Sequence, residues 1–322
     1  MDSIGASAGR GSGSAHRTSG SAISHYRIVA HLGRGGMGEV YKAEDTRLGR
    51  FVALKFLSEA LTDDPTALER LRREARAASA LNHPNICAIH DIDESDEQPF
   101  LVMEFLEGRT LNVKSAGRPQ ALPEILNVAR QVAAALEASH DKQIIHRDIK
   151  PSNIMITSRG EVKVLDFGLA KVSRGLSSDA STEMTELGTV LGTVSYMSPE
   201  QALGRPVDTR SDLFSLGVML YEMATGRLPF SGSTAMETIN LIINAEPEAV
   251  TGLNVNIPPG LERIISRCLE KNAEYRFQSA GELLTDLGKA DPDTARLVDG
   301  RWSQYFPAGK IEMGDSERGH LD

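Results

Sequence analysis

Four short segments of this 322-residue chain carry side chains suited to phosphate chemistry. The first is HLGRGGMGEVYKA, in which Gly33, Gly35 and Gly38 precede Val40. Glycines let a backbone approach phosphate oxygens closely, so that its amide N–H groups can cradle negative charge. We expect a strand to follow, which argues against a dinucleotide fingerprint, and the Gly-Lys-Ser/Thr ending of a Walker A loop is missing. Alone, the segment would equally fit a flexible hairpin.

Lys55 lies in the next apolar strand, within the sequence VALK. An ammonium group at this place can reach phosphate oxygens as a point charge. Its flexible stem needs a carboxylate partner to hold it. Glu74, in the helix that follows, is the preferred partner, and Glu69 is an alternative that lies off the apolar stripe of that helix.

The third and fourth segments, HRDIKPSN and LDFG, supply acid–base groups and metal ligands. Asp148 can accept a hydroxyl proton or orient the hydroxyl, and Lys150 can stabilise a transferring phosphoryl group. Asn153 can hold a metal ion, and Asp166 is a hard oxygen ligand suited to Mg²⁺. The four segments in this order indicate phosphoryl transfer, which relies on positioning and electrostatics.

Composition and charge narrow the class of protein. The net charge is −9, which favours solubility and gives no sign of nucleic-acid binding. Cys87 and Cys268, the two cysteines, are far apart and outside any metal-type spacing, so we expect small apolar core residues without a disulfide. No run of about 18 apolar residues predicts a membrane span, and no secretory signal is recognisable at the start. A cytoplasmic location is expected.

The predicted elements divide the chain into a small strand-rich part and a larger helical part. Strands are expected at 26–32, 38–45, 50–57, 86–94 and 99–106. Helices are expected at 65–81 after an N-cap at Asp64, at 123–140, at 211–226 with a buried body ending at Gly226, and at 233–245, 260–271 and 279–289.

These elements predict an α+β fold in two lobes joined by a hinge near 104–108. The domains are a flexible Gly/Ser-rich tail at 1–24, a β-rich N-lobe with one main helix at 25–107, a mainly helical C-lobe at 108–290 and a C-terminal tail at 291–322. Order is expected to begin near Tyr26.

Taken together, the segments resemble a protein kinase over about residues 26–290. HRDIKPSN is similar to the Ser/Thr class, and RREARAASALNHPNI is most similar to the bacterial eukaryotic-like Ser/Thr kinases. The resemblance implies the bilobal protein kinase fold, ATP as phosphoryl donor, Mg²⁺ or Mn²⁺ as metal, and Ser/Thr hydroxyls of proteins, including its own, as acceptors.

The resemblance also implies roles for individual residues. Lys55 and Glu74 form an ion pair, Asp148 is the catalytic base, and Asn153 and Asp166 hold the metals. The residues expected around ATP are Leu32, Gly33, Arg34, Gly35, Gly36, Met37, Gly38, Glu39, Val40, Ala53, Lys55, Met103, Glu104, Leu106, Met155 and Asp166.

Three further positions match the large lobe of the family. Asp212 is expected to brace the HRD backbone, although a helix N-cap is the alternative. Glu200 is expected to pair with Arg276. The chain departs from the family where Ser198 replaces the usual Ala and Phe214 the usual Trp, and neither change removes a catalytic group.

The stretch STEMTELGTVLGTVSYMSPE, residues 181–200, falls between DFG and SPE and so matches an activation segment. The resemblance implies that the Thr193 hydroxyl bonds Asp148 and Lys150. Autophosphorylation is expected within 177–189, where a phosphate would add about −1.5 to −2 charge and Arg147 would receive it. The preferred sites are Thr185, then Thr182, then Thr189.

Two other functions compete with this interpretation. A pseudokinase scaffold should lack Lys55, Asp148 or Asp166, and none is missing. A small-molecule phosphotransferase would not be expected to carry the glycine loop, the segment from DFG to SPE and Arg276 together. A weak homodimer through the N-lobe is a further hypothesis, while the physiological substrate and the activating signal stay open.

Overall fold

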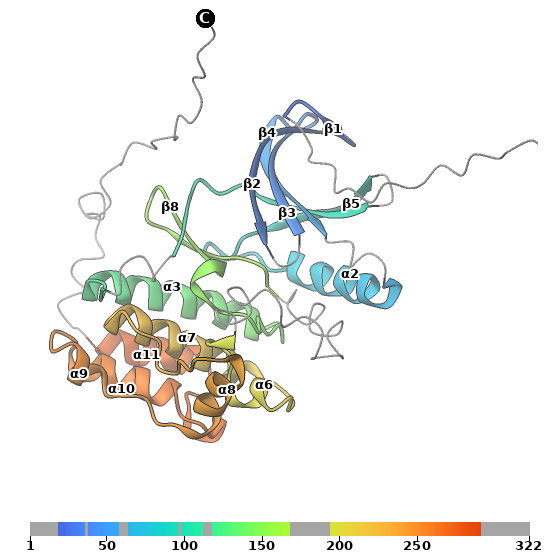
Figure 1. Ribbon diagram of the computed structural model, residues 1–322. Helices are drawn as coiled ribbons and strands as arrows, with labels where there is room; N and C mark the ends of the chain where they lie inside the picture. Colours follow the sequence, from blue (N-terminus) through green and yellow to red (C-terminus); the bar gives the residue numbers. More distant parts are fainter. Residues whose placement is uncertain are drawn as a thin grey trace, which may run out of the picture.

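The chain forms two lobes joined by one short connection (Figure 1). The computed structural model describes residues 19–35, 38–57, 64–95, 98–111, 118–167 and 194–290. A curled sheet and one helix make the upper lobe in the figure, and helices make most of the lower lobe. The predicted α+β bilobal fold is confirmed.

The N-lobe contains a six-stranded antiparallel sheet in the order β1-β2-β3-β4-β6-β5. Its strands are Ala22–Ile23 (β1), Tyr26–Gly35 (β2), Gly38–Asp45 (β3), Arg50–Leu57 (β4), Ile89–Ser95 (β5) and Gln98–Glu104 (β6). β1 pairs with β2 through Ala22 and Arg27. β1 lies before residue 24, the expected end of the tail, so this hairpin starts before Tyr26.

The two faces of this sheet have different partners because side chains alternate along each strand. One face forms a cluster that includes Tyr41, Leu54, Phe56 and Phe100. On the other side, helix α2 (Pro65–Ser79) packs Leu71 and its neighbours against Leu57 and Leu101. The helix begins as predicted, with the Asp64 side chain accepting from the N–H of Thr66 at 2.8 Å.

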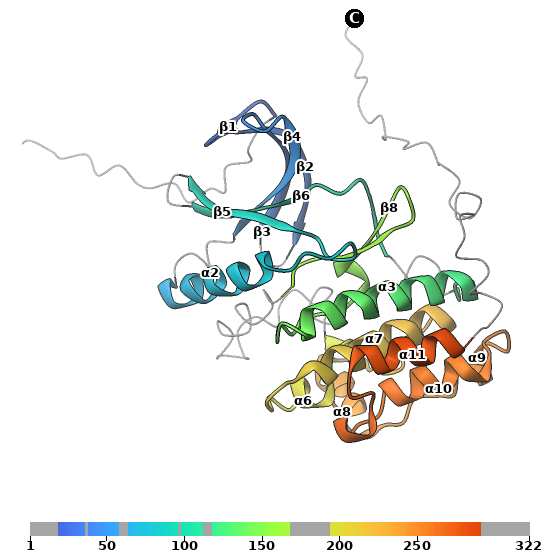
Figure 2. The same ribbon diagram turned by 180° about the vertical axis from the view of Figure 1, so that it is seen from behind.

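The C-lobe is organised around two buried helices, α3 (Leu122–His140) and α7 (Thr209–Thr225). α7 is buried on nearly all sides and ends at Gly226 with φ 72°, as predicted from its apolar sequence. Gly217 lets it approach α10 (Pro259–Cys268), since a Cβ there would lie 2.4 Å from the Cβ of Cys268. Figure 2 shows α10 and α11 (Ala280–Lys289) beneath α3 from behind.

Several short elements complete the C-lobe. The remaining helices are α6 (Pro199–Ala202), α8 (Ala235–Asn244), α9 (Val250–Leu253) and the 3₁₀ turns η1 (Pro151–Asn153) and η2 (Ala273–Tyr275). A three-stranded sheet, Gly108–Thr110 (β7), Ile154–Thr157 (β8) and Val162–Val164 (β9), was not predicted. It holds the segment between Asn153 and Asp166.

Other expectations from composition can be compared with the structure. Cys268 is fully buried, as expected, whereas Cys87 is only half-buried beside the hinge. Among the described helices, none combines the length and the apolar character that a membrane crossing requires.

Candidate active site

The glycine-rich segment forms the predicted hairpin between β2 and β3. Gly33 lies opposite Val40, and Gly35 lies opposite Gly38. Gly38 has φ 135°, and a Cβ on it would lie 1.8 Å from the carbonyl oxygen of Phe56. This position therefore requires glycine, which keeps the hairpin close to β4. Gly36 and Met37 lie outside the described residues.

Four of the residues expected around ATP share one face of the N-lobe sheet. Val40 pairs with Lys55, and Ala53 pairs with Met103 in the neighbouring strand. Side-chain alternation puts these four on the face opposite the Tyr41 cluster. Met155 comes from β8 in the C-lobe. The residues expected around ATP thus come from both lobes.

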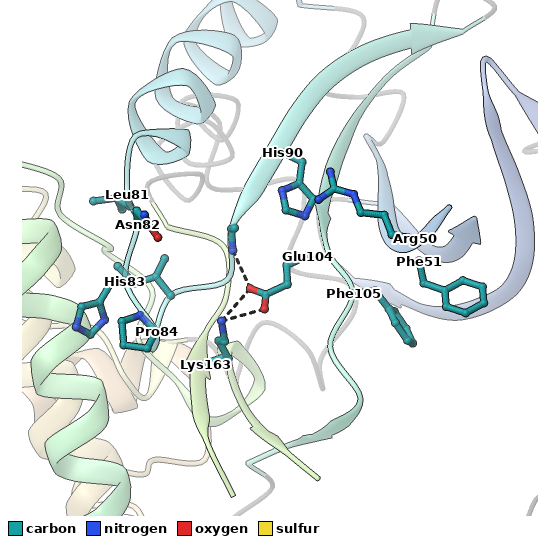
Figure 3. A pocket seen from close by; sticks show the side chains of 12 residues that line it. Arg50, Phe51, Leu81, Asn82, His83, Pro84, His90, Glu104, Phe105 and Lys163 are labelled. Carbon is teal, nitrogen blue, oxygen red and sulfur yellow. Dashed lines mark hydrogen bonds and ion pairs between the residues drawn. The ribbon is translucent and has the colours of Figure 1, made fainter. Parts of the chain in front are cut away.

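The hinge begins at Glu104, the last residue of β6, and hydrogen bonds from Lys163 and Ala88 hold this residue in place. Lys163 of β9 donates to both carboxylate oxygens of Glu104 at 2.9 Å (Figure 3). The N–H of Ala88 donates to Glu104 Oε2 at 3.3 Å, and the N–H of Glu104 donates to the carbonyl of Ala88 at 2.9 Å. These bonds fix the strand from which Leu106 follows.

A pocket of about 450 Å³ opens on this rear side of the hinge (Figure 3). Its lining includes Arg50, His83, His90 and Phe105, and Glu104 is the one residue it shares with those expected around ATP. This pocket is therefore not the expected nucleotide site.

Lys55 reaches across the lobes to Asp166. Its Nζ donates to Asp166 Oδ2 at 2.7 Å, and the lysine side chain is almost fully buried. Burial raises the pKa of Asp166, but the charge and hydrogen bond of Lys55 outweigh that effect and the net pKa is lowered. Asp166 is thus held as a carboxylate. The ion pair between Lys55 and Glu74, a half-buried residue of α2, stays a prediction.

The loop that follows α3 contains three of the expected catalytic residues. Lys150 Nζ contacts Asp148 Oδ2 at 2.8 Å. Asn153 Nδ2 donates to the same oxygen at 2.9 Å and to the Asp148 carbonyl at 2.8 Å. Both contacts meet Oδ2, so the role of base that is expected of Asp148 would fall to Oδ1.

Asp212 braces the backbone before Asp148, as the resemblance implied. Its Oδ2 accepts from the N–H of His146 at 2.8 Å, and its Oδ1 accepts from the N–H of Arg147 at 2.7 Å. His140 Nε2 also lies 2.8 Å from Oδ2. The N-cap alternative is wrong, because Asp208 occupies the N-cap of α7.

His146 connects this loop to the DFG segment. Its Nδ1 accepts from the N–H of Asp148 at 3.2 Å, so Nε2 carries the hydrogen that it donates to Leu165 O at 2.7 Å. The ring also meets Phe167 edge-on with centroids 4.7 Å apart. Asp148 and Asp166 are therefore positioned by one connected set of bonds.

Arg276 and Glu200 form the expected ion pair at the base of the site. The buried guanidinium donates to both Glu200 oxygens at 2.8 and 2.9 Å. Burial raises the pKa of Glu200, but the Arg276 bonds and a hydrogen bond from Ser211 lower it to about 2. This pair fixes α6, which follows the expected activation segment.

Thr182, Thr185, Thr189 and Thr193 lie outside the described residues, so the roles expected for them stay predictions. Two residues of the described ranges that contact the site were not predicted from the sequence. Lys163 and Gln201 contact the hinge and the catalytic loop, respectively, and no local motif marks either residue. Their partners lie more than 50 positions away in the sequence, at separations of 59 and 54.

A Mg²⁺ ion would find two oxygen donors here, the Asn153 amide and the Asp166 carboxylate. Within the described ranges, no group of three or more His, Cys, Asp or Glu side chains is placed to hold a metal ion. Mg²⁺ commonly binds through one or two carboxylates together with substrate phosphates, so this donor set fits that mode.

Comparison with known proteins decides the family. The family model of the protein kinase domain matches residues 26–286. The chain belongs to the protein kinase family. The solved kinase domain of Mycobacterium tuberculosis PknI has the same fold, with a TM-score of 0.67 and 26% identity over 86% of this chain and 100% of that one.

Two relatives of this kinase-family chain come from bacteria. It is 43% identical over 267 residues to the probable serine/threonine-protein kinase SCO3848 of Streptomyces coelicolor, covering 81% of this chain and 39% of that protein. It is 40% identical over 279 residues to PrkC of Bacillus subtilis, covering 86% and 42%. The expected resemblance is confirmed, and the chain spans about two fifths of the length of these curated relatives.

Proposed function

We propose that this chain transfers the γ-phosphoryl group of ATP to serine and threonine hydroxyls of proteins. The observation that carries the proposal is the Lys55–Asp166 contact at 2.7 Å, which joins residues 111 positions apart across the two lobes. It sets a phosphate-binding ammonium beside a metal-binding carboxylate. Family membership and the names of the relatives support the same activity.

Each side chain has a distinct task in this proposal. Lys55 binds phosphate oxygens, and Asp148 orients the acceptor hydroxyl and takes its proton on Oδ1. Lys150, 2.8 Å from Asp148 Oδ2, balances the negative charge on the phosphoryl group during transfer. Asn153 and Asp166 would hold Mg²⁺, or Mn²⁺, which neutralises phosphate charge when bound.

Regulation is proposed on the basis of the sequence. Autophosphorylation within 177–189 would add negative charge, and Arg147, beside the catalytic Asp148, would receive it. Thr185 is the preferred site. Pairing of two copies through the N-lobe and a cytoplasmic location also remain proposals.

The Asp148→Asn variant tests the assignment of the base. Asparagine keeps the shape and can still contact Lys150, but it cannot accept the hydroxyl proton. We expect a wild-type unfolding midpoint and transfer to a generic basic protein reduced by about 10²-fold or more. Near wild-type transfer by this variant would refute the role of Asp148. Label on a small alcohol instead of protein would favour a small-molecule phosphotransferase.

A further inference from the structure

Gln201 lies in α6, directly after the Ser198-Pro199-Glu200 motif. Both the oxygen and the nitrogen of its side-chain amide make hydrogen bonds. Its Oε1 accepts from the backbone N–H of Ser198 at 3.0 Å, while the Ser198 Oγ accepts from the N–H of Gln201 at 3.3 Å. This reciprocal pair is a capping box, which fixes the start of α6.

The amide nitrogen of Gln201 leaves the helix and contacts the catalytic loop. Nε2 donates to the carbonyl oxygen of Arg147 at 2.9 Å. The N–H of Arg147 is already bound by Asp212 Oδ1 at 2.7 Å. Arg147 has φ 69°, a left-handed conformation that is strained in a non-glycine residue. Bonds at both its N–H and its carbonyl hold it in that conformation.

The carbonyl of Arg147 and the N–H of Asp148 belong to one planar peptide unit. The N–H side of this unit donates to His146 Nδ1 at 3.2 Å, and the carbonyl side accepts from Gln201. Two hydrogen bonds therefore hold the orientation of the peptide unit before Asp148. One comes from His146 in the catalytic loop, and the other comes from Gln201 in α6. Loss of the Gln201 bond would free one side of it to rotate.

We propose that Gln201 is a positioning residue for Asp148, which makes the orientation of the catalytic carboxylate depend on the placement of α6. This inference rests on the proposed kinase function. Glu200, the adjacent residue in α6, is anchored by the buried Arg276, so the helix is a rigid platform for this contact. Glutamine suits the place because its amide offers one acceptor and one donor.

Two substitutions separate the cap from the contact with Arg147. Gln201→Glu keeps an oxygen for the N–H of Ser198 but has no hydrogen to donate to Arg147, and Gln201→Met has neither group. Ser198→Ala is the matched control, because it removes a cap acceptor and leaves both side-chain bonds of Gln201 in place.

Steady-state transfer to a generic basic protein gives the first readout. We expect kcat to fall about tenfold in both Gln201 variants, with KM for ATP within about twofold of wild type, because the nucleotide residues are untouched. Ser198→Ala should stay within about twofold in both constants. Wild-type kcat in Gln201→Glu, or an equal loss in Ser198→Ala, would overturn the proposal.

Amide hydrogen exchange gives a readout that does not need activity. Peptides covering residues 145–150 should exchange faster in Gln201→Glu than in wild type or Ser198→Ala. Unchanged exchange there would overturn the positioning role even if kcat fell. An inactive wild-type protein with faster exchange in Gln201→Glu would instead refute the kinase function and leave the contact supported.

Discussion

Replacing Glu200 by glutamine should lower the free energy of unfolding by about 3 kcal/mol at neutral pH. Arg276 is fully buried and donates to both Glu200 oxygens. Its other bonds go to the carbonyls of Arg210, Glu270 and Lys271. Contact with Arg276 outweighs burial and lowers the pKa of Glu200 from 4.5 to about 2. At about 1.36 kcal/mol per pKa unit, this shift corresponds to about 3 kcal/mol. Breaking a buried pair costs about 3–5 kcal/mol in other proteins, which agrees.

The same pair predicts a pH dependence of stability. The pKa of Glu200 is lower in the folded state, so its contribution is fully present above 4.5, the ordinary pKa, and is lost as pH falls through about 2. At pH 3.5 about 2 kcal/mol of it should remain. The difference between wild type and Glu200→Gln should therefore shrink as the solution is acidified.

Urea unfolding followed by circular dichroism at pH 7 and pH 3.5 measures both effects. Glu94→Gln is the control, because it breaks the Arg72–Glu94 pair, whose side chains are 42% and 48% exposed, and should cost less than about 1 kcal/mol. A loss below about 1 kcal/mol in Glu200→Gln at pH 7, or one no larger than in the control, would refute the reasoning.

Three further substitutions test the parts of the site. Asp212→Asn places an amide N–H₂ where a carboxylate oxygen accepts from His146, so kcat for labelled phosphate transfer should fall about tenfold or more. Gly38→Ala puts a Cβ 1.8 Å from a backbone oxygen and should raise KM for ATP about tenfold in steady-state assays. Lys163→Met removes the bonds behind the hinge and should raise KM for ATP about threefold without changing kcat, because Glu104 loses two contacts. Wild-type kinetic constants in any of these variants would refute the role given to the residue that was replaced.

Local signals in the sequence predicted most of the helices. α2 begins after Asp64 because the capping carboxylate and Pro65 act within one turn, and α7 ends at Gly226 because glycine tolerates φ 72°. Both of these signals lie within a few residues of the feature they specify. The order of the catalytic segments placed Lys55 and Asp166 among the residues expected around ATP, but it did not predict the contact between them.

Features that depend on distant pairing could not be predicted in the same way. The β7–β8–β9 sheet has strands of three and four residues, too short for a periodic pattern. The contact of Lys163 with Glu104 depends on how the two lobes meet. Taken alone, neither side chain can be distinguished in the sequence from an ordinary charged surface residue. The hydrogen bond from Gln201 to Arg147 likewise forms only because α6 packs beside the catalytic loop.

The most direct test of the central claim is acid hydrolysis of a protein substrate after incubation with this chain, Mg²⁺ and ATP labelled at the γ-phosphate, with α-labelled ATP as the parallel sample. Transfer by the Asp148 site predicts labelled phosphoserine or phosphothreonine from γ-labelled ATP and no protein label from α-labelled ATP. Absence of label from the γ position, label on tyrosine alone, or label from the α position would contradict the account.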